Sequence, residues 1–163
     1  MTTDAPNDAL TIRRADLDDA VARALIQELN EELTRRYPEE GATHFRLDRE
    51  EVAPGRGAFL VAMRGSDPVG CGAVRRFDPD PTTVEVKRMY TRRSARGQGA
   101  ARAILQALEA EARALGAKRM ILETGTRQPE AVALYRRAGF TRIEPWGEYI
   151  DSPTSICMEK LLD

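Results

Sequence analysis

The chain has 163 residues, which is enough for one domain with a sizeable hydrophobic core and too few for two ordinary domains. Its composition, with 31% charged and 42% apolar residues, excludes a disordered or membrane-spanning chain, and a net charge of −1 gives no basis for general attraction to nucleic acid or acidic membranes. No signal peptide and no 18-residue apolar run is seen, so we expect one cytoplasmic domain over residues 1–163, with residues 1–9 flexible.

The N-terminal part of the sequence predicts a strand and then a long helix. Residues 10–15 (LTIRRA) are typical of a short strand, and Asp16 is the expected N-cap of a helix over residues 17–36. Apolar residues recur every four positions there, at Leu17, Val21, Leu25, Leu29 and Leu33, as in an amphipathic helix. Pro38 ends this helix, and a second short helix is expected over residues 49–52.

The middle of the sequence predicts an antiparallel meander. Residues 58–77 contain two apolar runs around the turn residues 65–68, which indicates a hairpin, and residues 78–82 (DPDPT) form a second loop. Residues 84–91 (VEVKRMYT) then alternate like a strand. This alternation places Val84, Val86, Arg88 and Tyr90 on one face and Glu85, Lys87 and Met89 on the other.

The second half of the sequence alternates helices with strands. Helices are expected over residues 99–115 and 129–138, and strands over residues 118–124, 140–144 and 154–162. The β-α-β-α-β order predicts parallel pairing through short crossovers. The whole pattern predicts an α/β fold of the α+β type, with a mixed, mostly antiparallel, twisted sheet of about six or seven strands and about four flanking helices.

Cysteine and histidine are too few for several common kinds of site. Cys71 and Cys157 lack the spacing of a disulfide framework, a redox motif or a metal site, so we expect two packed thiols. His44 is the only histidine and is expected in a partly exposed loop. A zinc site or a Ser-His-Asp triad would depend on that one residue, so no metal site is predicted.

A glycine turn enters the helix expected over residues 99–115. The stretch 96–105 (RGQGAARAIL) is not a P-loop, which needs GxxxxGK[ST], and a GxGxxG fingerprint would place Arg102 where a small residue is required. A helix start of small residues offers unpaired N–H groups and the positive end of the helix dipole to an anion such as a pyrophosphate. Arg92, Arg93 and Arg96 add positive charge. A glycine-rich helix entry with solvated arginines is the alternative.

A second stretch, residues 128–140 (QPEAVALYRRAGF), decides between these interpretations. Together with RGQGAA it resembles the GNAT superfamily of acetyl-CoA-dependent N-acetyltransferases. Arg96, Gly99 and Ala101 match that family's R/Q-x-x-G-x-G/A motif, and Ala131, Leu134, Tyr135, Gly139 and Phe140 match its A-x-x-L-Y-x-x-x-G-F motif. The resemblance is strong over about residues 58–140 and implies the GNAT fold, whose sheet is splayed at the cofactor cleft, with acetyl-CoA as the cofactor.

The resemblance implies where this cofactor would lie. It would sit between the strand at residues 84–91 and its parallel neighbour near residues 120–124, with the pantetheine arm on the first strand's end and the pyrophosphate on the N–H groups of residues 96–101. The implied cofactor-binding residues are Met89, Tyr90, Thr91, Arg96, Gly97, Gln98, Gly99, Ala100, Ala101, Gln128, Ala131 and Tyr135. Gln128 departs from the family pattern, because many relatives carry Asn there.

Acyl transfer from a thioester to an amine needs a neutral amine, a stabilised oxyanion and a protonated leaving thiolate. Glu85 is the first candidate for the base, because histone-type relatives place their catalytic glutamate eleven residues before the position of Arg96, and Glu123 is the second. Tyr135 stands where relatives use the phenol to protonate or hydrogen-bond the departing sulfur. A backbone N–H near Met89 or Tyr90 is expected to meet the oxyanion. The structural alternative for Glu85 and Glu123 is an ion pair on the strand surface, and for Tyr135 it is packing in the core with its hydroxyl satisfied.

The acceptor is predicted less sharply than the cofactor. In this superfamily the N-terminal helices and late loops usually recognise it, and here residues 28–40 and 144–155 are acidic with aromatic residues interleaved. The predicted acceptor-binding residues are Glu28, Glu31, Trp146 and Tyr149, with Glu32, Glu148 and Asp151 as further candidates for holding a cationic amine. They favour a small amine, polyamine or amino acid, ahead of a protein amine. A solvated helix face and a surface loop are the alternative.

Two other classes of function share some of these sequence features. A catalytically silent acyl-CoA-binding module would carry the same cofactor motifs, although Glu85 and Tyr135 argue mildly against it. A nucleic-acid binder would use Arg75, Arg76, Arg88, Arg92, Arg93 and Arg96, but the net charge is wrong and no stacking aromatic residues accompany them. Many relatives pair through late strands, and residues 154–162 offer an apolar edge for a homodimer.

Overall fold

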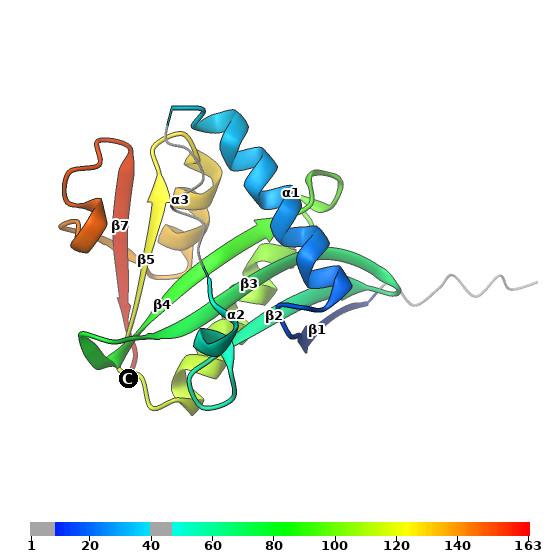
Figure 1. Ribbon diagram of the computed structural model, residues 1–163, viewed down its shortest axis with the longest axis horizontal. Coiled ribbons are helices and arrows are strands. Elements are labelled where there is room, and N and C mark those ends of the chain that lie inside the picture. The colour runs from blue at the N-terminus through cyan, green and yellow to red at the C-terminus, as the bar shows by residue number, and fades with distance from the viewer. Residues whose placement is uncertain (1–8, 40–46) are drawn as a thin grey trace, which may run out of the picture.

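The computed structural model describes residues 9–39 and 47–163, in which seven strands form one sheet covered by three α-helices (Figure 1). The strands are β1 (Leu10–Arg14), β2 (Gly57–Arg64), β3 (Asp67–Phe77), β4 (Asp80–Thr91), β5 (Arg119–Gly125), β6 (Thr141–Ile143) and β7 (Ser155–Leu161). The helices are α1 (Ala20–Arg36), α2 (Ala100–Ala114) and α3 (Pro129–Arg137), with 3₁₀ helices at Arg49–Val52, Arg93–Ala95 and Gly147–Tyr149. The predicted mixed sheet is confirmed, and the short helix expected at residues 49–52 is one of the 3₁₀ helices.

The sheet is opened between its two parallel strands. The strand order is β1-β2-β3-β4-β5-β7-β6, and within this sheet only β4 and β5 run parallel. Their ladder joins residues 83–86 to residues 119–122, although β4 continues to Thr91 and β5 to Gly125. Beyond the ladder the two strands diverge (Figure 1), as expected for a splayed sheet.

The last strand takes a position that the order of elements did not predict. We expected the strands near residues 118–124 and 140–144 to pair in parallel, but β7 lies between β5 and β6 and is antiparallel to both. β7 buries Cys157 and Met158, whereas the short β6 exposes Thr141 and Arg142, so the more apolar strand occupies the inner position. β7 is therefore not the open edge that we predicted for a homodimer.

The helices cover the two faces of the sheet unequally. α1 packs on one face, with Leu25 against Phe59 and other residues of β2 and β3, and α2 and α3 pack on the other face (Figure 1). Ile104 and Leu108 of α2 are fully buried on that second face. Cys71 is 0% and Cys157 1% exposed, so both thiols are packed in the interior as predicted.

A β-bulge interrupts β4. In the pairing with β3, Cys71 is opposite Tyr90 and Ala73 is opposite Lys87. Arg88 and Met89 therefore share the single partner position Gly72, which is the mark of a bulge. Arg88 has φ 59°, in the left-handed region that a non-glycine residue rarely adopts.

The bulge reverses the side-chain alternation that we predicted for the end of β4. Met89 packs against the α2 side of the sheet together with Val84 and Val86, whereas Tyr90 packs on the α1 side. The prediction was wrong from Arg88 onward because one extra residue shifts every later side chain to the opposite face. Gly72 accommodates this arrangement, since a Cβ there would lie 2.6 Å from Met89 Sδ.

Helix α1 begins three residues later than predicted. The Oδ2 of Asp19 accepts a hydrogen bond from the backbone N–H of Ala22 at 3.1 Å and caps the helix. Asp16, the predicted cap, instead accepts from the N–H of Asp18 at 3.0 Å in the preceding turn. α2 and α3 lie within one residue of their predicted limits.

In the described ranges, none of the helices combines the length and apolarity that crossing a membrane requires, and no cluster of three or more side chains suited to a metal is found there. His44 and most of the segment predicted to be flexible, residues 1–8 of 1–9, lie outside the described residues.

Candidate active site

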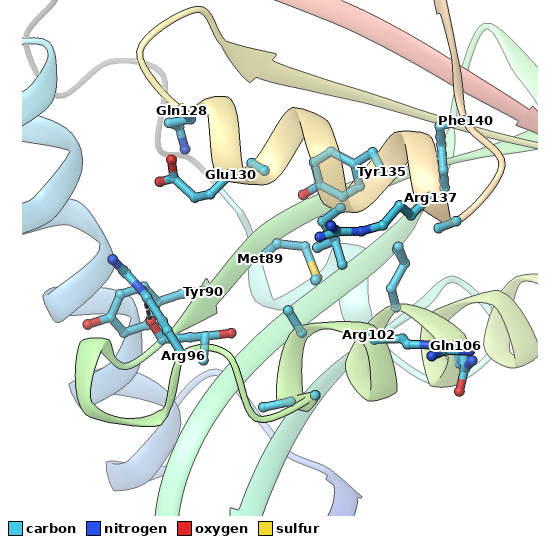
Figure 2. Close-up of a pocket in the computed structure, with 18 of the residues that line it drawn as sticks. Met89, Tyr90, Arg96, Arg102, Gln106, Gln128, Glu130, Tyr135, Arg137 and Phe140 are labelled. Atoms are coloured by element: carbon cyan, nitrogen blue, oxygen red, sulfur yellow. Dashed lines mark hydrogen bonds between the residues drawn. The ribbon is translucent and has the colours of Figure 1, made fainter.

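A larger cavity of about 930 Å³ lies between α2, α3 and the end of β4 (Figure 2). Its lining includes these residues implied as cofactor-binding: Met89, Tyr90, Thr91, Arg96, Gly97, Gly99, Ala100, Ala101, Gln128, Ala131 and Tyr135. Gln98, the remaining one, is exposed and does not line it. Figure 2 shows Tyr135 of α3 and Met89 of β4 at the centre, with Arg102 and Gln106 on the α2 side.

The N-terminus of α2 forms one wall of this larger cavity. Gly97 and Gly99 have φ 78° and 87°, a conformation that glycine adopts at little cost. A Cβ at either position would meet nothing within 4 Å, so backbone conformation rather than crowding calls for glycine. The first turn, with Ala100 and Ala101, presents unpaired N–H groups and the positive end of the helix dipole at this wall. Such a wall suits an anion.

Two of the three arginines that the sequence assigned to the anion site, Arg92 and Arg96, are held by carboxylates of α1, whereas Arg93 is exposed. Arg96 donates from Nη2 to Oε1 of Glu32 at 2.6 Å and from Nε to the Thr91 carbonyl at 3.0 Å. Arg92 donates from Nη2 to Oε2 of Glu28 at 2.7 Å. These ion pairs tie α1 to the loop after β4. Glu28 was predicted to bind the acceptor, but it pairs with Arg92. It lines neither this larger cavity nor a second, smaller cavity next to it.

Three cationic residues of the larger cavity were not predicted: Arg102, Arg137 and Lys160. Arg102 lies three residues after Gly99 and so projects from the same side of α2 one turn further on. That spacing is the signal in the sequence that could have indicated Arg102. Lys160 Nζ lies 2.8 Å from Oε1 of Glu109, which also lines the cavity.

A smaller cavity of about 130 Å³ lies between α1, the diverging ends of β4 and β5 and the loop before β7. Its polar lining includes Glu85, Lys87, Arg88, Glu123, Gln128, Tyr149, Ser152, Thr154 and Ser155. Four residues, Leu29, Met89, Gln128 and Tyr135, line both cavities. The two cavities therefore share a boundary, at which a molecule in one can approach a molecule in the other.

Tyr135 stands at this boundary and is 5% exposed. Its ring packs edge-on against Phe140, with the centroids 5.8 Å apart. Burial, and to a lesser degree the Glu123 carboxylate, raises the pKa of Tyr135 well above its ordinary value, because both disfavour the phenolate. The phenol is thus a neutral O–H donor at neutral pH.

Two carboxylates, the predicted candidates for the base, line the smaller cavity from adjacent strands. Glu85 is 3% exposed, and its Oε1 accepts from Arg75 Nη2 at 2.8 Å and Nε at 3.2 Å. Arg75 also pairs with Glu51. Glu123 is partly exposed and faces the cavity from β5. Glu85 therefore has the arginine partner of its structural interpretation, and both carboxylates line the smaller cavity.

The predicted acceptor-binding residues separate in space. Tyr149 lines the smaller cavity, and burial together with the Glu85 and Glu123 carboxylates raises its pKa. Trp146 lies behind it, with ring centroids 5.4 Å apart and the rings nearly perpendicular, and does not line the cavity. Glu31 lies on the exposed face of α1, where Gln27 donates to it at 3.3 Å.

Two cations of the smaller cavity were not assigned to the acceptor by sequence reasoning. Lys87 and Arg88 line it from β4, and burial lowers the pKa of both, to about 10 for Arg88. Arg88 Nη1 donates to Oδ1 of Asn30 in α1 at 2.8 Å. The simple alternation of a strand assigned Arg88 to the same face as Val84, and only the bulge brings it to the α1 side.

The arginines of the nucleic-acid interpretation do not form one exposed basic surface. Arg75, Arg92 and Arg96 pair with glutamates, and Arg76 donates to three backbone carbonyls. The three arginines whose charges are balanced by glutamates attract a phosphate backbone weakly. The geometry therefore argues against that interpretation.

The chain is similar in sequence to a known protein family and to a named relative. Residues 22–140 match the model of the Acetyltransferase (GNAT) family. The chain is 43% identical over 150 residues to a protein of Azospirillum brasilense named IAA acetyltransferase, covering 92% of this chain and 95% of that protein.

Solved structures match the fold over nearly the whole chain. A Klebsiella pneumoniae protein assigned as an acyl-CoA N-acyltransferase superposes with a TM-score of 0.78 at 30% identity, covering 96% of this chain and all of that one. The PaiA N-acetyltransferase of Thermoplasma acidophilum, solved in complex with coenzyme A, superposes with a TM-score of 0.70 at 16% identity, covering 94% of this chain and 99% of that one.

Proposed function

The chain belongs to the GNAT acetyltransferase family, and on that premise we propose that it moves an acetyl group from acetyl-CoA to the primary amine of a small molecule, by direct attack in a ternary complex. The observation that carries this proposal is that the two cavities share a boundary at Tyr135 and Met89. Direct attack needs both substrates bound at once with their reacting atoms adjacent, and such a boundary supports that arrangement.

The residues of the larger cavity fit an acyl-CoA donor, which GNAT enzymes use. In this proposal the N–H groups of residues 96–101 hold the pyrophosphate, and the end of β4 from Met89 to Thr91 binds the pantetheine arm. The small first turn of α2 lets phosphates approach the backbone, and Arg102 and Arg137 add positive charge along the wall. When bound, acetyl-CoA supplies a thioester whose acetyl carbon is open to attack.

On the acceptor side, the chain must help to produce a neutral amine. An ordinary alkylamine with a pKa of about 10.4 is almost entirely protonated at pH 7, a handicap of about 4–5 kcal/mol. We propose that Glu85 or Glu123, directly or through water, takes the proton. The amine nitrogen then bonds to the acetyl carbon as the carbon–sulfur bond breaks, while a backbone N–H of Met89 or Tyr90 donates to the carbonyl oxygen that gains charge.

Tyr135 is proposed to donate a proton or hydrogen bond to the departing sulfur. Its neutral phenol stands where the cavities meet, and a proton released by the amine can restore it. General acid catalysis is typically worth ~10²–10⁴ in rate. We therefore expect Tyr135→Phe to lower kcat by about 10²-fold or more while coenzyme A binds as before.

The test is a panel of amines with the purified full-length chain, in which acceptor-dependent release of free thiol is followed for the wild type and for Tyr135→Phe. The panel holds small amines, polyamines, amino acids, a lysine peptide and, because a relative carries it in its name, IAA. Small-amine turnover that falls in the variant, with equal coenzyme A affinity and thermal stability, supports the proposal. Tight coenzyme A binding without any acceptor-dependent thiol would indicate the silent module, and turnover confined to the peptide or to IAA would contradict a small amine.

A further inference from the structure

The smaller cavity carries positive charge that the proposed chemistry does not use. Lys87 and Arg88 line it, and neither lines the larger cavity, where the phosphates of a coenzyme A donor would bind. A cavity that only had to accept an alkylamine or polyamine would gain nothing from cations in its wall, because like charges repel. Because Glu85 and Glu123 line the same cavity, its wall carries both signs of charge and favours an acceptor that bears an anion as well as an amine.

Lys87 belongs to a group of balanced charges. It lies in the electrostatic field of Glu85, Arg75 and Glu51. Arg75 forms a salt bridge with each of the two glutamates. Two cations and two carboxylates thus stand together on this part of the sheet. Arg88 is the cation next in the chain, at the bulge and beside the boundary residue Met89.

Arg88 is held in place at some conformational cost. Its φ of 59° is unfavourable for a side chain with a Cβ, and such strain is retained where the surrounding structure or a function requires it. Asn30 of α1 orients the guanidinium through the hydrogen bond to its Nη1. Burial lowers the pKa of Arg88 only to about 10, so the group remains charged at neutral pH. A planar guanidinium fixed in this way presents paired N–H donors that match the two oxygens of a carboxylate.

A carboxylate of the neighbouring strand lines the same cavity as Arg88. Glu123 lines the smaller cavity from β5, and its charge acts on both Tyr135 and Tyr149. The diverging strands thus line one cavity with the Arg88 cation of β4 and the Glu123 anion of β5, and the hydroxyls of Ser152, Thr154 and Ser155 line it as well. A ligand that spans it gains most if it carries an anion and an amine a few bonds apart.

We propose that the acceptor is an amino acid whose carboxylate binds Arg88 while its amine lies between Glu123 and Tyr135. This inference rests on the proposed function and narrows its acceptor from amines in general to amines that carry a carboxylate. The cavity of about 130 Å³ holds the head group of such a molecule, whose amine then adjoins the boundary with the larger cavity.

The first experiment compares matched acceptors with the full-length wild-type chain. Each amino acid is tested beside its carboxamide and its decarboxylated amine, and acceptor-dependent thiol release gives kcat/KM. We expect the free amino acids to exceed their carboxamides by at least about tenfold, the effect of one charge-assisted hydrogen-bonded pair. Equal or better turnover of the carboxamides or amines overturns this inference and leaves the proposed function standing. Absence of acceptor-dependent thiol with every amine overturns both.

The second experiment assigns the effect to Arg88. Arg88→Gly removes the guanidinium and suits the observed φ, so it is expected to fold, and Arg88→Lys keeps the charge without the planar fork. We expect Arg88→Gly to lower kcat/KM about 10- to 100-fold for amino acids but less than about threefold for carboxamides. For amino acids, the kcat/KM of Arg88→Lys should lie between those of the wild type and Arg88→Gly.

Arg23→Met is the matched control, because it removes one exposed arginine of α1 outside both cavities. It should change kcat/KM for neither kind of acceptor. An equal loss for both kinds of acceptor in Arg88→Gly would assign Arg88 a structural role and refute the proposal.

Discussion

Burial sets the reactivity of the two thiols, Cys71 and Cys157. It raises the pKa of Cys71 to about 12 and that of Cys157 to about 11, because a thiolate is disfavoured in an apolar interior. The thiolate is the reactive form, and a thiol with a pKa near 11 is about one part in a thousand thiolate at pH 8. We expect neither cysteine of the native chain to react with a disulfide reagent at pH 8 on the timescale of an activity assay, and both to react in denaturant.

The same shifts predict a loss of stability in alkali. A thiol whose pKa is raised on folding binds its proton more tightly in the folded state, so its contribution to stability is complete below the unfolded pKa of about 8.5. It is lost as the pH rises from there toward about 11 and 12. Denaturant midpoints from pH 7 to 10.5 should therefore fall less in Cys71→Ala than in the wild type. A parallel fall in both would contradict the assignment to this thiol.

Residue positions could be predicted where the signal was local. The glycine turn and the Tyr135 segment are short patterns, and the cofactor-binding residues implied from them, Gln98 excepted, line the larger cavity. Arg88 could not be placed, because a bulge depends on the partner strand and on the room beside Gly72. The acidic residues of α1 were read as an acceptor site because sequence gives no distance to Arg92 and Arg96, which Glu28 and Glu32 bind.

Among the elements, the C-terminus of α1 is fastened to the loop between β5 and α3. The hydroxyl of Tyr37 accepts from the N–H of Arg127 at 3.0 Å and donates to Oε1 of Gln128 at 3.4 Å. Arg36 and Arg127 each donate to the other's carbonyl, at 3.0 and 2.8 Å. Because Gln128 lines both cavities and Tyr37 lines the smaller one, this contact fixes part of their shared wall.

Gly125 makes that contact possible, and its replacement tests the contact. A Cβ at Gly125 would lie 1.7 Å from the Tyr37 hydroxyl, so Gly125→Ala must displace Tyr37. We expect a loss of about 1–3 kcal/mol in unfolding free energy and a rise in KM for the acceptor, measured by denaturant titration and by thiol release. In a Tyr37→Ala background the same Gly125→Ala change should cost clearly less, because the closest clash, with the Tyr37 ring and hydroxyl, is gone. Additive costs in this double-mutant cycle would show that Gly125 acts elsewhere.

Element limits were predictable to within a few residues, and strand order was less so. Helices α2 and α3 agree with their predicted ranges because glycine or proline punctuates both ends. The insertion of β7 between β5 and β6 is a long-range outcome, settled by which strand buries more apolar surface. No local pattern specifies that choice.

At the scale of the whole molecule, the larger cavity separates two parts of the chain. α2 and β4 form one side, and α3, which follows β5, forms the other (Figure 1). The parallel ladder between β4 and β5 covers only residues 83–86 and 119–122. A ligand that contacts both sides would therefore add a bridge where the sheet itself provides few backbone hydrogen bonds.

This arrangement predicts that coenzyme A stabilises the fold, and that the N-terminus of α2 is responsible. At about 100 times its Kd, a ligand that binds only the folded state adds about 2.7 kcal/mol, or roughly 5–10 °C in Tm for a chain of this size. Gly99→Ala should lower the Tm and also abolish most of the Tm increase that coenzyme A causes, because it distorts the first turn that would hold the pyrophosphate.

Gly116→Ala is the matched control for Gly99→Ala. Gly116 has a similar positive φ, 79° against 87°, and equally open surroundings, but it lies after the far end of α2. Gly116→Ala should lower the Tm to a comparable degree and keep the full shift, as thermal melts over a coenzyme A series would measure. Equal loss of the shift in both variants would trace it to general destabilisation rather than to the N–H groups at residues 96–101.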